Sequence, residues 1–177
     1  MSYRACVCSF FLVIASVASQ ASAQQMPEHV QTALGKLVGK WTMETVVDGK
    51  KTQSKIVVEW AVNDTVLMFK WQGTDFITGK QEASTGILGW NPIKKLVVEY
   101  EIGSGGYTSQ ATHHISKDGK WVSPIRGSTF LDGKAVFYEE QRTFRFVSKD
   151  EWVVTGTDRV IDGEPQPSDK STFRRNK

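Results

Sequence analysis

Cysteine is nearly absent from this sequence. The chain has 177 residues and two cysteines, Cys6 and Cys8, which both lie near its N-terminus. The rest of the chain therefore contains no disulfide scaffold, no thiolate metal site and no cysteine nucleophile. Excess charge of one sign is also absent, since 22 Lys and Arg residues stand against 19 Asp and Glu. This balance excludes binding through a polybasic surface, and we expect no nucleic-acid partner.

Catalytic motifs are missing as well. The sequence contains no G-x-S-x-G elbow, no H-E-x-x-H motif, no glycine-rich phosphate loop after a strand and no Cys-x-x-Cys pair. We therefore predict no metal site, and no motif indicates an enzyme. Disorder is excluded by what is present, because 40% of the residues are hydrophobic and 11% are aromatic.

The first 23 residues have the pattern of a secretory signal peptide. Arg4 precedes an apolar run over residues 5–18, and Ala21-Ser22-Ala23 fits an A-x-A cleavage site. The run is shorter than the ~20 residues of a spanning helix, and no later segment approaches that length, so we expect no membrane span after it. The sequence predicts an exported protein, periplasmic or secreted, with a single domain over residues 24–177. An uncleaved N-terminal anchor is the alternative.

Only one segment has helical spacing. Val30, Ala33, Leu34 and Leu37 fall at positions i, i+3, i+4 and i+7, and Gly39 is placed to end the helix. This pattern predicts a short amphipathic helix of about ten residues. Such a helix is too small to be a domain, so the fold must come from the strands that follow.

The remainder of the chain is a series of strands and tight turns. Asp-Gly, the dipeptide that favours type I′ hairpin turns, occurs four times, beginning at Asp48, Asp118, Asp132 and Asp162. Runs rich in β-branched and aromatic residues predict strands at 40–47, 52–62, 65–73, 81–90, 95–102, 107–116, 121–130, 134–147, 152–161 and 170–175. Sequential antiparallel strands leave two open edges unless the sheet closes. We therefore predict an all-β fold, an antiparallel up-and-down β-barrel of about ten strands with the short helix plugging one end.

Alternation along the strands assigns residues to the two faces of the barrel. In most strands the large apolar side chains share one face, which indicates an apolar interior. The residues expected inside are Trp41, Met43, Thr45, Val47, Ile56, Val58, Trp60, Val62, Leu67, Phe69, Trp71, Leu96, Val98, Tyr100 and Ile102. A barrel of this strand number is wider than its side chains can fill, so we expect an internal cavity.

Some strands carry polar residues on both faces, and their phase stays open. In the strand 134–147, Glu140 and Arg142 enter the barrel if the aromatic face is inward. They then either hold the polar head of a ligand or form a buried ion pair with no ligand. In the strand 152–161, one phase turns Val153, Thr155, Thr157 and Arg159 inward, and the other turns Trp152, Val154 and Gly156 inward. The candidate ligand-binding residues are Tyr107, His113, Glu140, Arg142 and Arg159.

His113 and His114 are the most suggestive pair of side chains. Adjacent strand residues point to opposite faces, so the two rings cannot chelate one metal ion. One of them, facing a cavity, would suit an axial haem ligand or a general base. The structural interpretation is an inward histidine bonded to a neighbouring hydroxyl and a solvated one outside. We predict no cofactor, with haem on His113 or His114 as the alternative.

Two resemblances rest on particular segments. Gly39-Lys40-Trp41, at the start of the first strand after a helix, resembles the G-x-W signature of lipocalins and the wider calycin group. In that group the tryptophan packs across the closed end of the barrel, and a basic residue of the last strand stacks on it. The resemblance assigns this barrel-closing role to Trp41 with Arg174 or Arg175, and guanidinium over indole is a favourable contact.

The closer resemblance covers nearly all of residues 24–177. Residues 37–41, 86–92 and 158–165 are similar to segments of DUF1579-type proteins, a bacterial family of exported lipocalin-like proteins of unknown function. Asn91 stands where that family usually has aspartate. The resemblance implies a lipocalin-like barrel and export, and it implies no activity.

Four functions stay open at this point. The first is an exported barrel that binds a small, mostly apolar or amphipathic molecule in its interior. The others are a filled barrel that acts through its surface, a haem-binding barrel resembling the nitrobindins, and an enzyme of the cone-shaped isomerase or hydratase type. Nitrobindin-like barrels take their proximal histidine near the chain end, and no histidine follows His114. The isomerase fold needs several helices. We therefore expect the first function, and the sequence indicates no particular oligomeric state.

Overall fold

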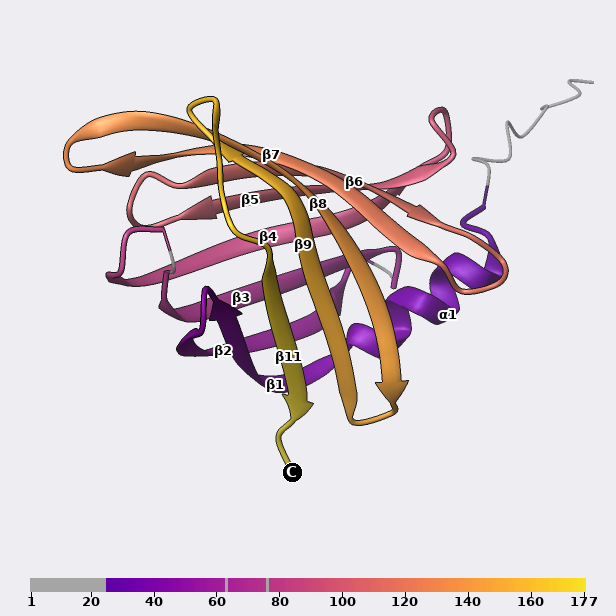
Figure 1. Cartoon of the computed structure of the whole chain (residues 1–177). Coiled ribbons are helices and arrows are strands. Elements are labelled where there is room, and N and C mark those ends of the chain that lie inside the picture. Colours follow the sequence, from indigo (N-terminus) through magenta and orange to yellow (C-terminus); the bar gives the residue numbers. More distant parts are fainter. Residues whose placement is uncertain (1–24, 63, 76) are drawn as a thin grey trace, which may run out of the picture.

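The computed structural model describes residues 25–62, 64–75 and 77–177. The predicted signal peptide, residues 1–23, lies outside the described residues. The elements are α1 (Glu28–Leu37), β1 (Gly39–Val47), β2 (Lys50–Ala61), β3 (Val66–Thr74), β4 (Gln81–Asn91), β5 (Leu96–Gly103), β6 (Thr108–Ile115), β7 (Trp121–Leu131), β8 (Lys134–Ser148), β9 (Glu151–Ile161), β10 (Glu164–Pro165) and β11 (Asp169–Arg175). Figure 1 shows the strands curving around a common interior.

The sheet closes into an antiparallel barrel of ten strands. β1 to β8 pair in sequence order, β9 pairs with β8 and with β11, and β11 pairs back with β1. β10 is a two-residue strand that pairs with Val160 and Ile161 of β9. Closure gives each of the ten barrel strands two neighbours and so removes the open edges. The predicted up-and-down barrel with one short helix is confirmed.

Asp-Gly pairs make three of the hairpin turns. Asp48, Asp132 and Asp162 have φ values of 47°, 51° and 48°, and the glycine after each is also at positive φ. Two successive positive φ angles define a type I′ turn, whose twist matches that of the flanking strands. The pair at Asp118 lies instead in the longer loop 116–120, where the glycine but not the aspartate has positive φ.

α1 closes one end of the barrel. Its apolar stripe of Val30, Leu34 and Leu37 is buried in the main core, and the helix contacts β6. Hairpins of an up-and-down barrel alternate between its ends, so the β6–β7 loop lies beside α1, whereas the β3–β4 and β5–β6 loops lie at the opposite end (Figure 1). We call these the closed end and the mouth end. No helix within the described residues is long and apolar enough to span a membrane.

Aromatic rings fill the barrel near the closed end. Trp152 stacks on Phe173 with ring centroids 3.5 Å apart and meets Trp41 edge-on at 6.0 Å. Trp121 stacks on Phe144 at 4.7 Å. These five side chains belong to or pack against the same core cluster as α1. Stacked and edge-to-face rings each add to the free energy gained from burying apolar area.

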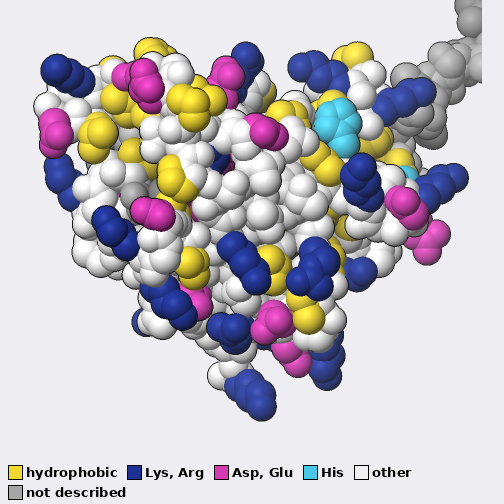
Figure 2. Space-filling model, in the orientation of Figure 1, with side chains coloured by type: hydrophobic (Ala, Val, Ile, Leu, Met, Phe, Trp, Pro, Cys, Tyr) yellow, Lys and Arg dark blue, Asp and Glu magenta, His cyan; other side chains and the backbone are white. Residues whose placement is uncertain are grey.

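The predicted phase of β5 is wrong. Val97 and Glu99 are buried, whereas Tyr100 and Ile102 are 50% and 70% exposed on the outside. The partner strand explains this, because Glu99 pairs with Leu88, which is also buried. The residues expected inside but lying on the outer phase of β5 are Leu96, Val98, Tyr100 and Ile102. Val62, also expected inside, follows the end of β2 and is 71% exposed. Figure 2 shows hydrophobic side chains among charged ones on one outer face.

The phase of β9 reverses part-way along the strand. Trp152 and Val154 line the interior, contrary to the phase that placed them outside. Asp158 has a φ of 52°, and beside it the register of β9 against β8 shifts by one residue. Such a bulge moves the following side chain to the other face. Arg159 is therefore also inside, at 7% exposure.

Candidate functional site

A cavity of about 160 Å³ lies inside the barrel. Its apolar part reaches α1 at the closed end and includes Leu37, Met43, Ile56, Val58, Phe69, Leu88, Phe144, Trp152, Val154 and Phe173. Its polar part reaches the β3–β4 connection at the mouth end and includes Asp75, Glu82, Glu99, Glu101, Tyr107, Arg142 and Asp169. A cavity of about 150 Å³ is large enough to hold benzene. This one therefore has room for a ligand of about one ring.

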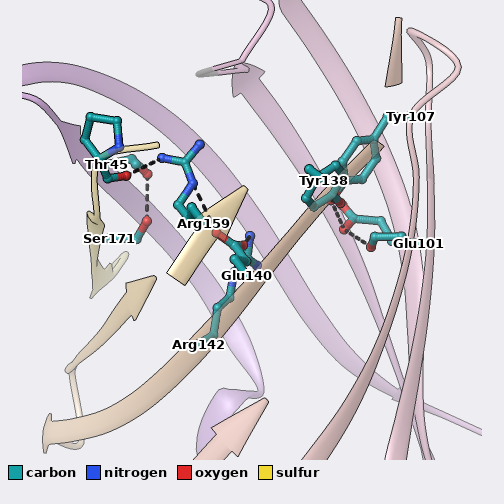
Figure 3. Close-up of polar contacts among 10 residues, drawn as sticks. Thr45, Glu101, Tyr107, Tyr138, Glu140, Arg142, Arg159 and Ser171 are labelled. Atoms are coloured by element: carbon teal, nitrogen blue, oxygen red, sulfur yellow. Dashed lines mark hydrogen bonds and ion pairs between the residues drawn. The ribbon is translucent and has the colours of Figure 1, made fainter. Parts of the chain in front are cut away.

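Glu101 is the centre of a hydrogen-bonded cluster in the polar part. Its carboxylate accepts hydrogen bonds from the hydroxyls of Ser84, of Tyr107 at 3.2 Å and of Ser109 at 3.3 Å. Tyr138 donates to the Tyr107 hydroxyl at 2.7 Å, and the two rings stack with centroids 5.9 Å apart (Figure 3). The phenols form a chain of donors that ends on the carboxylate.

Burial controls the ionisation of this cluster. It raises the pKa of Glu101, and the negative charge of Glu99 raises it further, although the hydrogen bond from Ser84 acts in the opposite direction. Burial, followed by the charge of Glu101, holds the pKa of Tyr107 well above its usual value. Tyr107 therefore stays protonated and remains a hydrogen-bond donor at neutral pH.

Arg142, Glu140 and Arg159 form a chain of ion pairs (Figure 3). Arg142 donates from Nε to Glu140 Oε1 at 2.5 Å, and Arg159 Nε lies 3.4 Å from Glu140 Oε2. Arg159 Nη1 also donates to the carbonyl of Pro167 at 3.0 Å. Burial lowers the pKa of Arg142, but the contact with Glu140 outweighs it, so the guanidinium stays charged. Arg142 borders the cavity, whereas the other two side chains lie behind it.

Asp169 is a site residue that the sequence patterns missed. It is 5% exposed, and its Oδ1 makes no hydrogen bond with any described residue. A Cβ on Gly156 would lie 1.9 Å from this oxygen and 3.0 Å from Glu140 Oε2, so the two carboxylates need a glycine there. Burial raises the pKa of Asp169, Arg142 partly offsets this, and Glu140 adds to it. The predicted last strand began one residue later, which left Asp169 in a loop.

His113 lies behind the cavity wall. Trp121 Nε1 donates to its Nδ1 at 3.0 Å, Ser123 Oγ lies 2.5 Å from the same nitrogen, and its Nε2 lies 2.9 Å from Glu99 Oε2. Ser, His and Glu are the residue types of a catalytic triad, but Ser123 is 0% exposed and does not line the cavity. Both ring nitrogens are engaged, which leaves neither for a haem iron. His114 is exposed outside the barrel.

Arg175, and not Arg174, covers the tryptophan at the closed end. Its guanidinium carbon lies 4.1 Å from the centre of the Trp41 ring, and its Nη1 donates to the carbonyl of Val38 at 2.8 Å. Arg174 points to the outside, where it pairs with Glu151 at 3.2 Å. Neighbours on a strand face opposite ways, so one arginine can make the contact.

The structure brings together four of the five candidate binding residues. Tyr107 and Arg142 line the cavity, Glu140 binds both Arg142 and Arg159, and His113 lies behind Glu99. The sequence patterns missed all five lining carboxylates, which are Glu99, Glu101, Asp169, Asp75 and Glu82. The first two were missed because β5 has apolar residues on both faces, so alternation alone cannot determine its phase.

Several solved barrels are similar to this chain. A redesigned β-barrel has a TM-score of 0.45 and 15% identity, over 82% of this chain and 96% of its own. A second redesigned barrel, bound to DFHBI, has a TM-score of 0.43 and 13% identity, over 81% and 98%. The S-type phycobiliprotein lyase of Guillardia theta has a TM-score of 0.46 and 15% identity, over 84% and 93%.

Comparisons at the level of sequence give no family. No protein-family model matches the chain, and no curated protein matches it. The resemblance to DUF1579-type proteins therefore stays a prediction. The barrel itself follows from the strand pairing described above.

Proposed function

We propose that this protein binds a small, mostly apolar molecule inside its barrel. The observation that carries the proposal is the cavity of about 160 Å³, which is apolar toward the closed end and polar toward the mouth end. A ligand in this space buries its apolar body against Trp152, Phe144 and Phe173. Its polar group then lies among the carboxylates and Arg142. The division of the lining supports an amphipathic ligand over a purely apolar one.

The size of the cavity limits the affinity of a one-ring ligand. Burying one ring gains about 3 kcal/mol, and a hydrogen bond adds about 1 kcal/mol. Together these correspond to a Kd of about 1 mM. Binding tests therefore need millimolar ligand.

Benzyl alcohol is a suitable probe, because it has one ring and one hydroxyl. We expect saturable binding to the purified protein, seen as a change in the fluorescence of Trp71 and Trp152, which line the cavity. Val58 lines the cavity, so the larger side chain of Val58→Phe should fill the space of the ligand ring and abolish binding. Val57→Phe, on the outer face of the same strand, is the matched control and should leave binding unchanged. Equal binding by both variants, with the fold intact by circular dichroism, would contradict the proposal.

We also propose that the protein is exported. The signal-peptide pattern of residues 1–23 supports this. Expressed in a bacterial host, the protein should be recovered outside the cytoplasm. Its mass should be that of a chain whose first residue lies near Gln24. A cytoplasmic chain that retains Met1 would contradict export.

A further inference from the structure

The ionisable side chains that line the cavity are mostly acidic. The carboxyl groups are those of Asp75, Glu82, Glu99, Glu101 and Asp169. Within the described lining, Arg142 is the one basic side chain, and Glu140 binds it from behind. The lining therefore has an excess of acidic over basic groups, and a ligand of complementary charge gains from it.

Glu99 is held by a hydrogen bond from His113. An indole N–H only donates, so the hydrogen bond from Trp121 makes His113 Nδ1 an acceptor. The proton of the neutral ring then sits on Nε2 and is donated to Glu99 Oε2 at 2.9 Å. A doubly protonated ring would set an N–H against the indole N–H. His113 therefore orients the Glu99 side chain through this hydrogen bond.

One carboxylate oxygen of Asp169, Oδ1, has no hydrogen-bond donor among the described residues. The side chain borders the cavity, and the residue is only 5% exposed. The unpartnered Oδ1 is fully buried. A buried carboxylate oxygen without a donor is destabilising. A cation in the cavity beside the Asp169 carboxylate offsets part of this cost electrostatically.

Arg142 does not turn the cavity into an anion site. Its Nε and Nη2 both lie 2.5 Å from Glu140 Oε1, so its charge is largely matched by that carboxylate. Glu101 and Asp169 both interact electrostatically with Arg142. An anionic head group beside Arg142 would therefore also meet these two carboxylates.

We infer that the cavity selects a small organic cation, an amine on an apolar body of about one ring, with its ammonium at Asp169 and in the field of Glu99 and Glu101. This inference rests on the proposed function and specifies its ligand class. The apolar body lies against the aromatic side chains Trp71, Phe144, Trp152 and Phe173, whose faces also attract cations.

Three ligands that share one ring but differ in charge test the effect of ligand charge on binding. Benzylamine, benzyl alcohol and benzoate are titrated into the same purified protein at neutral pH and followed by tryptophan fluorescence and calorimetry. We expect benzylamine to bind about tenfold more tightly than benzyl alcohol, as a hydrogen bond to a charged group predicts, and benzoate to bind most weakly. This comparison needs no variant, so it does not depend on how a substitution folds.

Variants locate the ammonium. Asp169→Asn should reduce benzylamine binding about tenfold, to the level of benzyl alcohol, and leave benzyl alcohol binding unchanged. Glu101→Gln should weaken benzylamine by a smaller factor, since its carboxylate already accepts hydrogen bonds. Glu139→Gln removes an exposed carboxylate from the outer face of β8 and should change neither ligand.

Each outcome decides between the two proposals. Equal affinities for benzylamine and benzyl alcohol would overturn the inference and leave the proposed function standing. Strongest binding by benzoate would overturn the inference and make Arg142 the head-group site. Binding of none of the three ligands would overturn the proposed function, and the inference with it.

Discussion

The two ends of the barrel bury different kinds of side chain, aromatic rings at the closed end and carboxylates toward the mouth end. At the closed end Trp41 is 1% exposed, donates from Nε1 to the carbonyl of Leu37 at 2.7 Å and is covered by Arg175. Toward the mouth end, Asp169 is 5% exposed, yet its Oδ1 has no hydrogen bond among the described residues, while the equally buried Glu140 pairs through Oε2 with Arg159 at 3.4 Å. Buried rings stabilise a fold, whereas unpaired buried oxygens destabilise it.

The two regions therefore contribute differently to stability. The closed end contains the packed rings that stabilise the fold, whereas the half nearer the mouth contains a buried carboxylate oxygen without a hydrogen bond among the described residues. The closed end has one unpaired polar atom as well, because Trp152 Nε1 is a buried donor without a partner in the described part of the chain. Substitutions in each region test whether the two regions differ in this way.

The largest effect is expected at the closed end. Trp41→Ala removes a fully buried ring that contacts Trp152 edge-on, and should lower the free energy of unfolding by about 3–5 kcal/mol. Urea unfolding followed by circular dichroism measures this. A loss below about 1 kcal/mol would show that the closed end does not hold the fold together.

Removing the shared carboxylate of the ion-pair chain comes next. Glu140→Ala leaves Arg142 and Arg159 without their common partner and should destabilise the protein by about 3 kcal/mol. The neighbouring Glu139→Ala acts on an exposed side chain of the outer face and should change stability by less than about 0.5 kcal/mol. If the two variants unfold at the same urea concentration, the chain of ion pairs has no structural role.

A smaller effect separates the two arginines of β11. Arg175→Ala loses the contact with Trp41 and the hydrogen bond to Val38, and should lower the free energy of unfolding by about 1–2 kcal/mol. Arg174→Ala loses an exposed ion pair with Glu151 and should change it by less than about 0.5 kcal/mol. The reverse order of the two losses would be incompatible with Arg175 as the barrel-closing residue.

Asp169→Asn should act in the opposite direction and stabilise the protein. Because the folded-state pKa of Asp169 is raised above its usual 3.8, the ionised carboxylate destabilises the fold at neutral pH. This penalty disappears as the pH falls through the raised pKa toward 3.8, since both states then bind the proton. The advantage of the variant in urea unfolding should therefore be present at pH 7 and shrink in acid.

An exposed aspartate provides the control for this pH dependence. The hydrogen bond from Ser116 lowers the pKa of Asp118, so its ionised form does not oppose folding. Asp118→Asn should give no gain at pH 7. A gain equal to that of Asp169→Asn would show that burial is not the cause.

Local patterns predicted most of the fold. Asp-Gly dipeptides located three type I′ turns, and alternation placed residues such as Trp41, Val58 and Leu67 correctly inside. These features depend only on neighbouring residues. Each of the ten barrel strands extends to within two residues of its predicted limits, whereas the two-residue β10 was not predicted.

The polar site was harder to predict, because it depends on register and on one bulge. No local pattern of β5 shows that Glu99 pairs with Leu88, and none shows that the bulge at Asp158 turns Arg159 inward. Asp169 becomes a site residue only because β11 brings it beside Gly156 of β9. Contacts between distant strands assemble the site, whereas the sequence patterns used here act over a few residues.

One melting experiment tests most directly whether Asp169 both lowers stability and binds the ligand. The wild-type protein and Asp169→Asn are melted with and without benzylamine at about ten times its Kd, where binding adds about 1.4 kcal/mol to the stability of the wild type. We expect the wild type to melt about 3 °C higher with the ligand. Asp169→Asn should begin at a higher Tm than the wild type and rise less with benzylamine. Equal starting temperatures and equal shifts would contradict the account, because Asp169 would then neither lower stability nor bind the ligand.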